Sequence, residues 1–133
     1  GETVWETFYK FAVIRNPYER MVSYYHFHKS PQYRFPALAK KYSFSDWLRR
    51  GLDNNLKKTQ SDYLDVEINQ VGRLETIQED FDLFCDLIKI PSYTLPKYNV
   101  STHEHWETYY SDDDKKIVYE IFQEDFDRFG FLI

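Results

Sequence analysis

The fold is decided by residues 11–25, FAVIRNPYERMVSYY. Residues 9–14 are β-prone and apolar apart from one lysine, which predicts a strand in a covered sheet. Asn16 is a favoured helix N-cap, and Pro17 suits the first position of a helix. The stretch therefore predicts a buried strand that ends at Arg15 and leads at once into a helix.

A strand end that runs directly into a helix N-terminus is a place where α/β folds bind anions. Unpaired backbone N–H groups and the positive end of the helix dipole lie there, and Arg15 adds a forked cation. Ser23 follows eight positions later, about two turns or about 10 Å along the helix. An anion held by both residues would lie against the flank of the first two turns. The alternative is a generic strand-to-helix junction with an exposed arginine.

The same stretch resembles the 3′-phosphate-binding motif of sulfotransferases that use 3′-phosphoadenosine 5′-phosphosulfate (PAPS). The resemblance rests on the strand, the run RNP at residues 15–17, Arg20, and the run VSYY at residues 22–25. In that family an arginine at the strand end and a serine eight residues later bind the 3′-phosphate of the donor. The resemblance assigns these roles to Arg15 and Ser23.

Length and composition limit the classes of protein to which the chain can belong. With 133 residues, one domain over residues 1–133 is expected. The net charge of −5 argues against a nucleic-acid binder, and the single Cys85 excludes an internal disulfide. No apolar run is long enough to span a membrane, so we expect a soluble chain as given. Its compartment is not readable: cytoplasmic if bacterial, or the Golgi lumen if it comes from a eukaryotic membrane-anchored enzyme.

The rest of the chain predicts one more strand and several helices. A helix is expected at residues 44–50 and a strand at residues 67–73, followed by a helix that Thr76 caps. A final helix is expected to begin after Ser111, with an apolar face that extends to Phe126. The fold class predicted is α/β: a helix-rich, partial P-loop-like sulfotransferase domain with few parallel strands.

Later motifs extend the resemblance toward the carbohydrate-modifying and bacterial branch of the family. They are QSDY at residues 60–63, GRLE at residues 72–75 and LPKYNVS at residues 95–101. Each is weak alone, but they occur in the order that the family shows. The resemblance thus covers nearly all of the chain.

The family's 5′-phosphosulfate loop has no counterpart in these residues. That loop is P-loop-like, carries a lysine and precedes the 3′-phosphate motif. Only fourteen residues precede Arg15, and Lys10 lies in the expected strand. No catalytic base is assigned. We therefore expect a fragment of a longer enzyme that is inactive alone; the alternative is a non-catalytic module that binds phosphate, sulfate or a nucleotide. A partial nucleotide kinase is a third reading, which would need a Walker loop.

Two His-x-His pairs, His26 with His28 and His103 with His105, raise the question of a metal. Two residues apart on a helix, the first pair faces nearly opposite sides, and structural zinc needs four converging ligands. No metal site is therefore predicted. His26 lies one turn after Ser23, so a role near the donor or acceptor is a hypothesis beside a plain helix histidine.

The sequence leaves two alternative roles for each of two further arginines. Arg20 either touches phosphate or pairs with an acid, and the acid pair is favoured. Arg73, at the end of the second strand, either lines the nucleotide cleft or lies at the surface.

By resemblance, the full enzyme would move a sulfuryl group from PAPS to a hydroxyl, most simply of a carbohydrate. Its partners would be an adenine nucleotide donor and that acceptor, with no nucleic acid. A sheet of so few strands leaves open edges, so a homodimer that completes the sheet is a further hypothesis.

Overall fold

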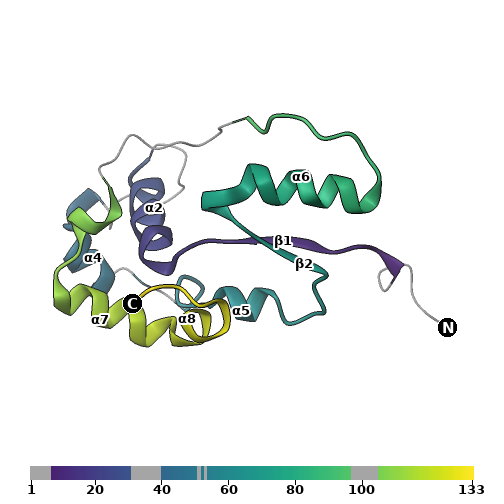
Figure 1. Ribbon diagram of the computed structural model, residues 1–133. Helices are drawn as coiled ribbons and strands as arrows, with labels where there is room; N and C mark the ends of the chain where they lie inside the picture. The colour runs from purple at the N-terminus through teal and green to yellow at the C-terminus, as the bar shows by residue number, and fades with distance from the viewer. Residues whose placement is uncertain (1–6, 31–39, 51, 53, 97–104) are drawn as a thin grey trace. The chain divides into compact units, whose positions relative to one another are not determined.

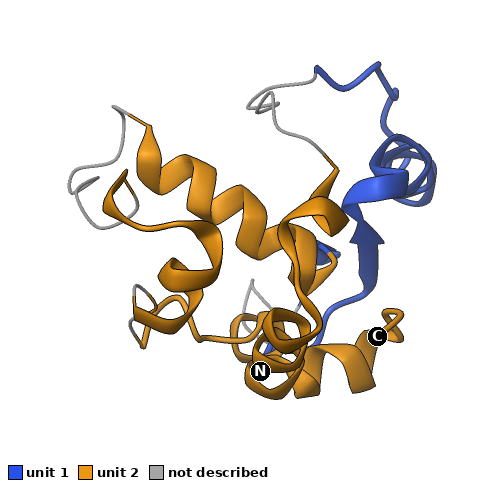
Figure 2. Ribbon diagram, turned by 90° about the vertical axis from the view of Figure 1, so that its left-hand side faces the viewer, with its two compact units in different colours: residues 1–15, 64–98 blue, residues 16–63, 99–133 orange. Residues whose placement is uncertain are grey.

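The computed structural model describes residues 7–30, 40–50, 52, 54–96 and 105–133. Residues 97–101 of the predicted LPKYNVS motif, and His103, lie outside the described residues. The chain divides into two compact units (Figure 2). The first consists of Gly1–Arg15 and Leu64–Tyr98, and the second of Asn16–Tyr63 and Asn99–Ile133. Each unit is built from segments distant in sequence.

The first unit is a two-stranded parallel sheet with one covering helix (Figure 1). Strand β1 (Phe11–Ile14) pairs with β2 (Gln70–Arg73) from Phe11 opposite Gln70 to Ile14 opposite Arg73. Both predicted strands form, each shorter than predicted at its N-terminal end. A short 3₁₀ turn, η1 (Leu74–Thr76), joins β2 to helix α6 (Ile77–Ile88), which lies along the sheet.

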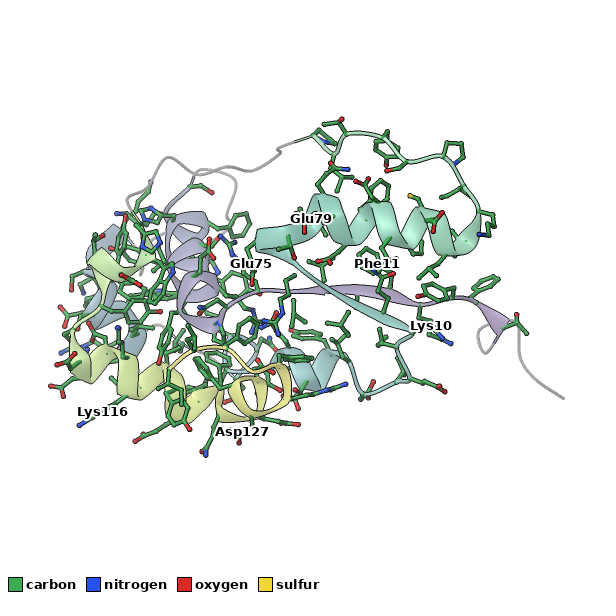
Figure 3. All side chains as sticks on the ribbon, in the orientation of Figure 1. Lys10, Phe11, Glu75, Glu79, Lys116 and Asp127 are labelled. Atoms are coloured by element: carbon green, nitrogen blue, oxygen red, sulfur yellow. The ribbon has the colours of Figure 1, made fainter. Side chains whose placement is uncertain are left out.

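Aromatic side chains pack α6 against the sheet. Phe11 of β1 stacks on Phe84 of α6 with the ring centroids 5.0 Å apart, and Cys85 beside it is 1% exposed. Figure 3 shows Phe11 between its strand and this helix. The prediction that Thr76 caps α6 is wrong, because its side chain makes no cap hydrogen bond. The Thr76 hydroxyl instead donates to the carboxylate of Asp80, at 2.8 Å.

The second unit is helical. It contains α2 (Pro17–Lys29), α4 (Phe44–Arg50), α5 (Gln60–Tyr63), the 3₁₀ turn η2 (Trp106–Tyr109), α7 (Asp112–Ile121) and α8 (Gln123–Phe129). The predicted helix at residues 44–50 is confirmed. The predicted final helix is two helices, because the chain breaks at Phe122, whose backbone leaves the helical region. Four residues of α2, at positions 18, 21, 22 and 25, are buried as one face.

Tyr18 is the centre of this second core, at 1% exposure. Its ring stacks on Trp106 at 5.2 Å and meets Phe126 at 5.1 Å and Tyr110 at 5.3 Å. The Tyr110 hydroxyl donates to the Tyr18 carbonyl at 2.7 Å. Burial, followed by the nearby Tyr18 and Asp114, raises the pKa of Tyr110 far above its usual value, so it stays a neutral donor.

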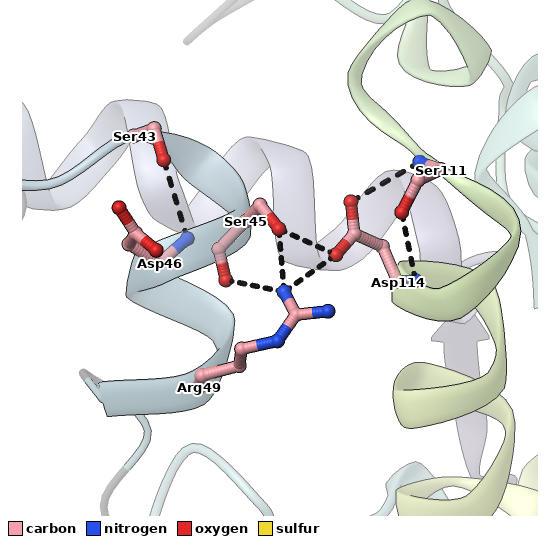
Figure 4. A network of polar contacts seen from close by, with 6 residues as sticks. All are labelled: Ser43, Ser45, Asp46, Arg49, Ser111 and Asp114. Atoms are coloured by element: carbon pink, nitrogen blue, oxygen red, sulfur yellow. Dashed lines mark hydrogen bonds and ion pairs between the residues drawn. The ribbon is translucent and has the colours of Figure 1, made fainter.

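One buried carboxylate ties α4 to α7 (Figure 4). Ser111 caps α7 with a reciprocal capping box to Asp114, as its position before the acidic run predicts. Asp114, 2% exposed, also accepts from the Ser45 hydroxyl at 2.7 Å and pairs with Arg49 at 2.7 Å. Burial alone would raise the pKa of Asp114, but these hydrogen bonds outweigh it and lower the pKa.

The observed fold is thus helix-rich with a small parallel sheet, which agrees with the α/β prediction. Among the described residues, none of the helices combines the length and apolar character that a membrane span requires.

Candidate functional site

The predicted strand-to-helix junction is present. β1 ends at Ile14, and α2 begins three residues later at Pro17. The Asn16 side chain caps the helix, because its Oδ1 accepts from the backbone N–H of Tyr18 at 2.9 Å. Pro17 takes the first helical position, where a missing N–H removes no hydrogen bond. The positive end of α2 therefore lies where the sequence predicts it.

The two residues assigned to the 3′-phosphate fall in different units. Arg15 is the last residue of the first unit's N-terminal segment and is half-buried. Ser23 lies in the second unit, in the second turn of α2, and is also half-buried. Each is described within its own unit, and their joint role stays a prediction.

A second arginine lies at the same edge of the sheet as Arg15. The parallel register pairs Ile14 with Arg73, so both strands end at one edge and Arg15 follows directly. The backbone N–H of Arg73 donates to the carboxylate of Asp80 at 2.8 Å, which fixes the end of β2. Ligands of parallel α/β sheets gather beyond the carboxyl ends of the strands. The first unit therefore carries two arginines at the sheet edge that suits an anion. Local sequence could not show this, because it depends on the pairing of two strands that are distant in the chain.

Arg20 is a structural residue. Its side chain is 8% exposed, and it donates to the Lys58 carbonyl at 3.3 Å and to the Tyr24 hydroxyl at 3.2 Å. Its guanidinium also lies 5.6 Å from the ring centre of Phe122. Within the described residues these partners are neutral groups rather than a carboxylate, so the expected pair with an acid is wrong.

The histidines that the structure describes have structural contacts in the second unit. The Nε2 of His26 lies 2.8 Å from the Tyr109 hydroxyl, which links α2 to η2. His28 is buried at 7% exposure, and His105 caps η2. His26 thus has a structural partner, and its suggested role near the donor or acceptor stays a hypothesis.

Comparison with known proteins gives one finding. A family model described as "Sulfotransferase family" matches residues 2–132. No curated protein and no solved structure matches the chain. The family match spans nearly the whole sequence, including the β1–α2 junction and the arginine that ends β2. The chain therefore belongs to the sulfotransferase family.

Proposed function

We propose that this protein serves the transfer of a sulfuryl group from PAPS to a hydroxyl of a carbohydrate, and that Arg15 and Ser23 bind the donor's 3′-phosphate. The observation that carries the proposal is the junction: a strand end, an arginine and an Asn-capped helix follow one another within residues 11–18. Backbone N–H groups, the helix dipole and a guanidinium are the groups that recognise phosphate. Arg73, at the same sheet edge, supports an anion site there.

The reaction requires more than a donor site. The acceptor oxygen attacks sulfur, the bond from sulfur to the bridging oxygen breaks, and that oxygen leaves on the 5′-phosphate with the electron pair. Cations or N–H groups must stabilise the leaving oxygen, and a base must take the acceptor's proton. We assign neither role among these residues. The proposal is therefore that residues 1–133 hold the 3′-phosphate end of the donor and do not turn over alone. We also propose that the domain is P-loop-like.

Calorimetric titration tests the donor site. Adenosine 3′,5′-bisphosphate is expected to bind more tightly than adenosine 5′-phosphate, and Arg15→Ala is expected to weaken it about tenfold or more, since a hydrogen-bonded charge contributes about 1.5–3 kcal/mol. Lys116→Ala, an exposed change on α7, is the matched control and should change nothing. Equal affinity for the two nucleotides, or full affinity in Arg15→Ala, would defeat the assignment.

A non-catalytic phosphate- or nucleotide-binding module is the second candidate, because the junction alone supports binding without supplying a base. Sulfation measured with labelled PAPS separates the two. If the full-length protein that contains these residues transfers sulfate, the transferase stands. If that protein binds the bisphosphate and transfers nothing, the binding module is correct.

The sheet edge supports a homodimer as a further part of the proposal. β1 and β2 form a two-stranded sheet, and short sheets gain stability from more strands. A second copy would supply them by pairing along an open edge. Light scattering of the chain at micromolar concentration is expected to give twice the monomer mass, and a monomer would contradict the dimer.

A further inference from the structure

Helix α6 is apolar on two sides. One side packs on the sheet, where Phe84 stacks on Phe11 and Cys85 is 1% exposed. The other side presents Leu83 and Leu87, which lie one helical turn apart and are each 50% exposed. A surface helix normally has a single apolar stripe, and a helix that is apolar beyond it is covered by further partners. The described residues leave the leucine side of α6 uncovered.

The segment that follows α6 packs on a different side of the helix. The Gln78 side chain donates to the Tyr93 carbonyl at 3.1 Å and accepts from the Leu95 backbone N–H at 2.8 Å. The Tyr93 ring also meets Phe81 of α6 edge-on, with the ring centroids 5.0 Å apart. A helix turns about 100° per residue, so these two anchors on α6 project away from Leu83. The segment is therefore fixed without covering the leucines.

Acidic side chains border the two leucines. Glu79 lies one turn before Leu83, and Asp86 lies beside Leu87, three residues after Leu83. Both acids are exposed, and Figure 3 labels Glu79 on α6. Among the described residues, neither acid forms an ion pair. We call Glu79, Leu83, Asp86 and Leu87 the acidic leucine face.

Negative charge is concentrated on this helix. Residues 74–90 contain five acids and one lysine, a net charge of −4, whereas the whole chain has −5. Glu79, Asp82 and Asp86 follow one another at spacings of three and four residues, at which like charges on a helix repel. Asp86 also lies in the last turn, which contains no basic residue and where the helix dipole favours cations. Cations held against this face would reduce both costs.

We propose that the acidic leucine face binds a basic amphipathic helix of another protein. Leucines four residues apart form a ridge that fits the groove of a second helix, whose apolar residues would cover Leu83 and Leu87. Lys or Arg residues beside that apolar stripe would pair with Glu79 and Asp86. The acids repel an acidic partner and the anionic headgroups of a lipid surface. Ile90, 47% exposed just past the end of α6, adds apolar area. This inference goes beyond the proposed donor site and does not depend on it.

Fluorescence anisotropy with three labelled fourteen-residue peptides tests the face. The basic peptide consists of leucine, alanine and lysine, with the leucines on one helical side and the lysines flanking them. The second peptide has glutamate in place of every lysine, and the third has the basic composition with its leucines spread around the helix. The basic peptide is expected to bind with an affinity that falls as salt rises, and the other two about tenfold or more weakly. Equal binding of either control peptide, or no binding of the basic one, would overturn the proposal.

The leucines are tested by an exposed double substitution. Leu83→Gln/Leu87→Gln is expected to weaken the basic peptide about tenfold or more, because the apolar contact is lost while glutamine keeps the helix propensity of leucine. Leu132→Gln, at a position 88% exposed in the second unit, is the matched control and should change nothing. Circular dichroism confirms that each variant is folded. Wild-type affinity in the double variant would refute the face.

The acids are tested by neutral substitutions of similar shape. Glu79→Gln/Asp86→Asn is expected to weaken the basic peptide about fivefold and to reduce the salt dependence, because two ion pairs are lost. This variant should unfold at no lower urea concentration than the wild type, since repulsion along α6 is relieved. Glu120→Gln/Asp127→Asn removes the same charge from exposed positions of the second unit and should leave binding unchanged. Equal losses in the two variants would show attraction by net charge alone and contradict the face.

A second copy of the chain is the other occupant that the experiment distinguishes. Light scattering is expected to give one and the same mass for the wild type and for Leu83→Gln/Leu87→Gln. A wild-type dimer that becomes a monomer in this variant would show that the face joins two copies, and would overturn the proposal. Both proteins are expected to bind adenosine 3′,5′-bisphosphate equally. A lower nucleotide affinity in the variant would contradict a face that is separate from the donor site.

Discussion

Replacing Asp125 with alanine is expected to lower the free energy of unfolding of the second unit by about 4 kcal/mol, at about 2 kcal/mol for each of two buried donors left unpaired. Asp125 is 0% exposed. Its Oδ2 accepts from the backbone N–H of Gln60 at 2.8 Å, and its Oδ1 accepts from that of Ser61 at 2.8 Å. The substitution would leave both N–H groups without an acceptor.

This carboxylate also explains why so short a helix forms. α5 has four residues, and isolated helices of that length are unstable in water. Asp125, 64 residues further along the chain than Ser61, supplies the acceptors at its start. Thr59 and Asp62 add a reciprocal pair of side-chain to backbone bonds, both at 2.9 Å. Anchoring from α8, rather than helix propensity, holds α5 in place.

Urea unfolding followed by circular dichroism measures the effect. Asp127→Ala is the control on the same helix; its side chain is exposed and it is labelled in Figure 3, so a change below about 0.5 kcal/mol is expected. Asp125→Asn keeps one acceptor oxygen, so its loss of unfolding free energy should lie between those of Asp125→Ala and Asp127→Ala. Amide hydrogen exchange should rise at Gln60 and Ser61 in Asp125→Ala. A wild-type unfolding midpoint, or unchanged exchange at both amides, would contradict the assignment.

Gly72→Val is expected to destabilise the first unit by about 2–3 kcal/mol, the usual range for overpacking a filled core. A Cβ atom at Gly72 would lie 2.8 and 2.9 Å from two ring carbons of Phe11 and 3.1 Å from the Cβ of Asp80. Valine adds two more carbons to that space. The Phe11 ring has little room to retreat, because it is stacked on Phe84 of α6.

A double-mutant cycle isolates this contact. Gly72→Ala alone places one carbon against the Phe11 ring and should lower the free energy of unfolding less than Gly72→Val does. Phe11→Leu removes the ring carbons that it would meet, so Gly72→Ala should cost less in the Phe11→Leu background than in the wild type. Unfolding free energies of the four proteins give the coupling. Additive effects would show that the overlap with Phe11 is not what makes glycine necessary.

Local signals in the sequence were sufficient for the β1–α2 junction and for the start of α7. The Asn16 cap, Pro17 and the Ser111 cap all act within three residues along the chain. Such interactions depend mainly on residue type and spacing, so the sequence predicts them; the reciprocal capping box of Ser111 with Asp114 was added by the structure. The prediction that Thr76 caps α6 was wrong. Its spacing fits a capping box, but its hydroxyl donates to the carboxylate of Asp80 instead.

The contacts that organise each unit join residues far apart in sequence. The register that sets Arg73 opposite Ile14 depends on the pairing of strands 59 positions apart, from Phe11 opposite Gln70 onward. The link between α2 and residue 42 depends on the Tyr25 hydroxyl, which donates to a carbonyl 17 positions away. Composition shows that cations are present, but not that Lys41 and Arg50 lie over the same ring of Tyr42.

The sequence by itself determined the strand-to-helix junction, because a cap and a first-turn proline act at short range, and its resemblance to the sulfotransferase family supplied the residues proposed for the donor's 3′-phosphate. Only the tertiary structure decided that Arg20 is a buried structural residue, that Asp125 holds α5, and that Lys41 and Arg50 lie over the same tyrosine ring. Those outcomes depend on which distant segments pack together. Packing is set by the shape and burial of whole faces, which no local motif specifies.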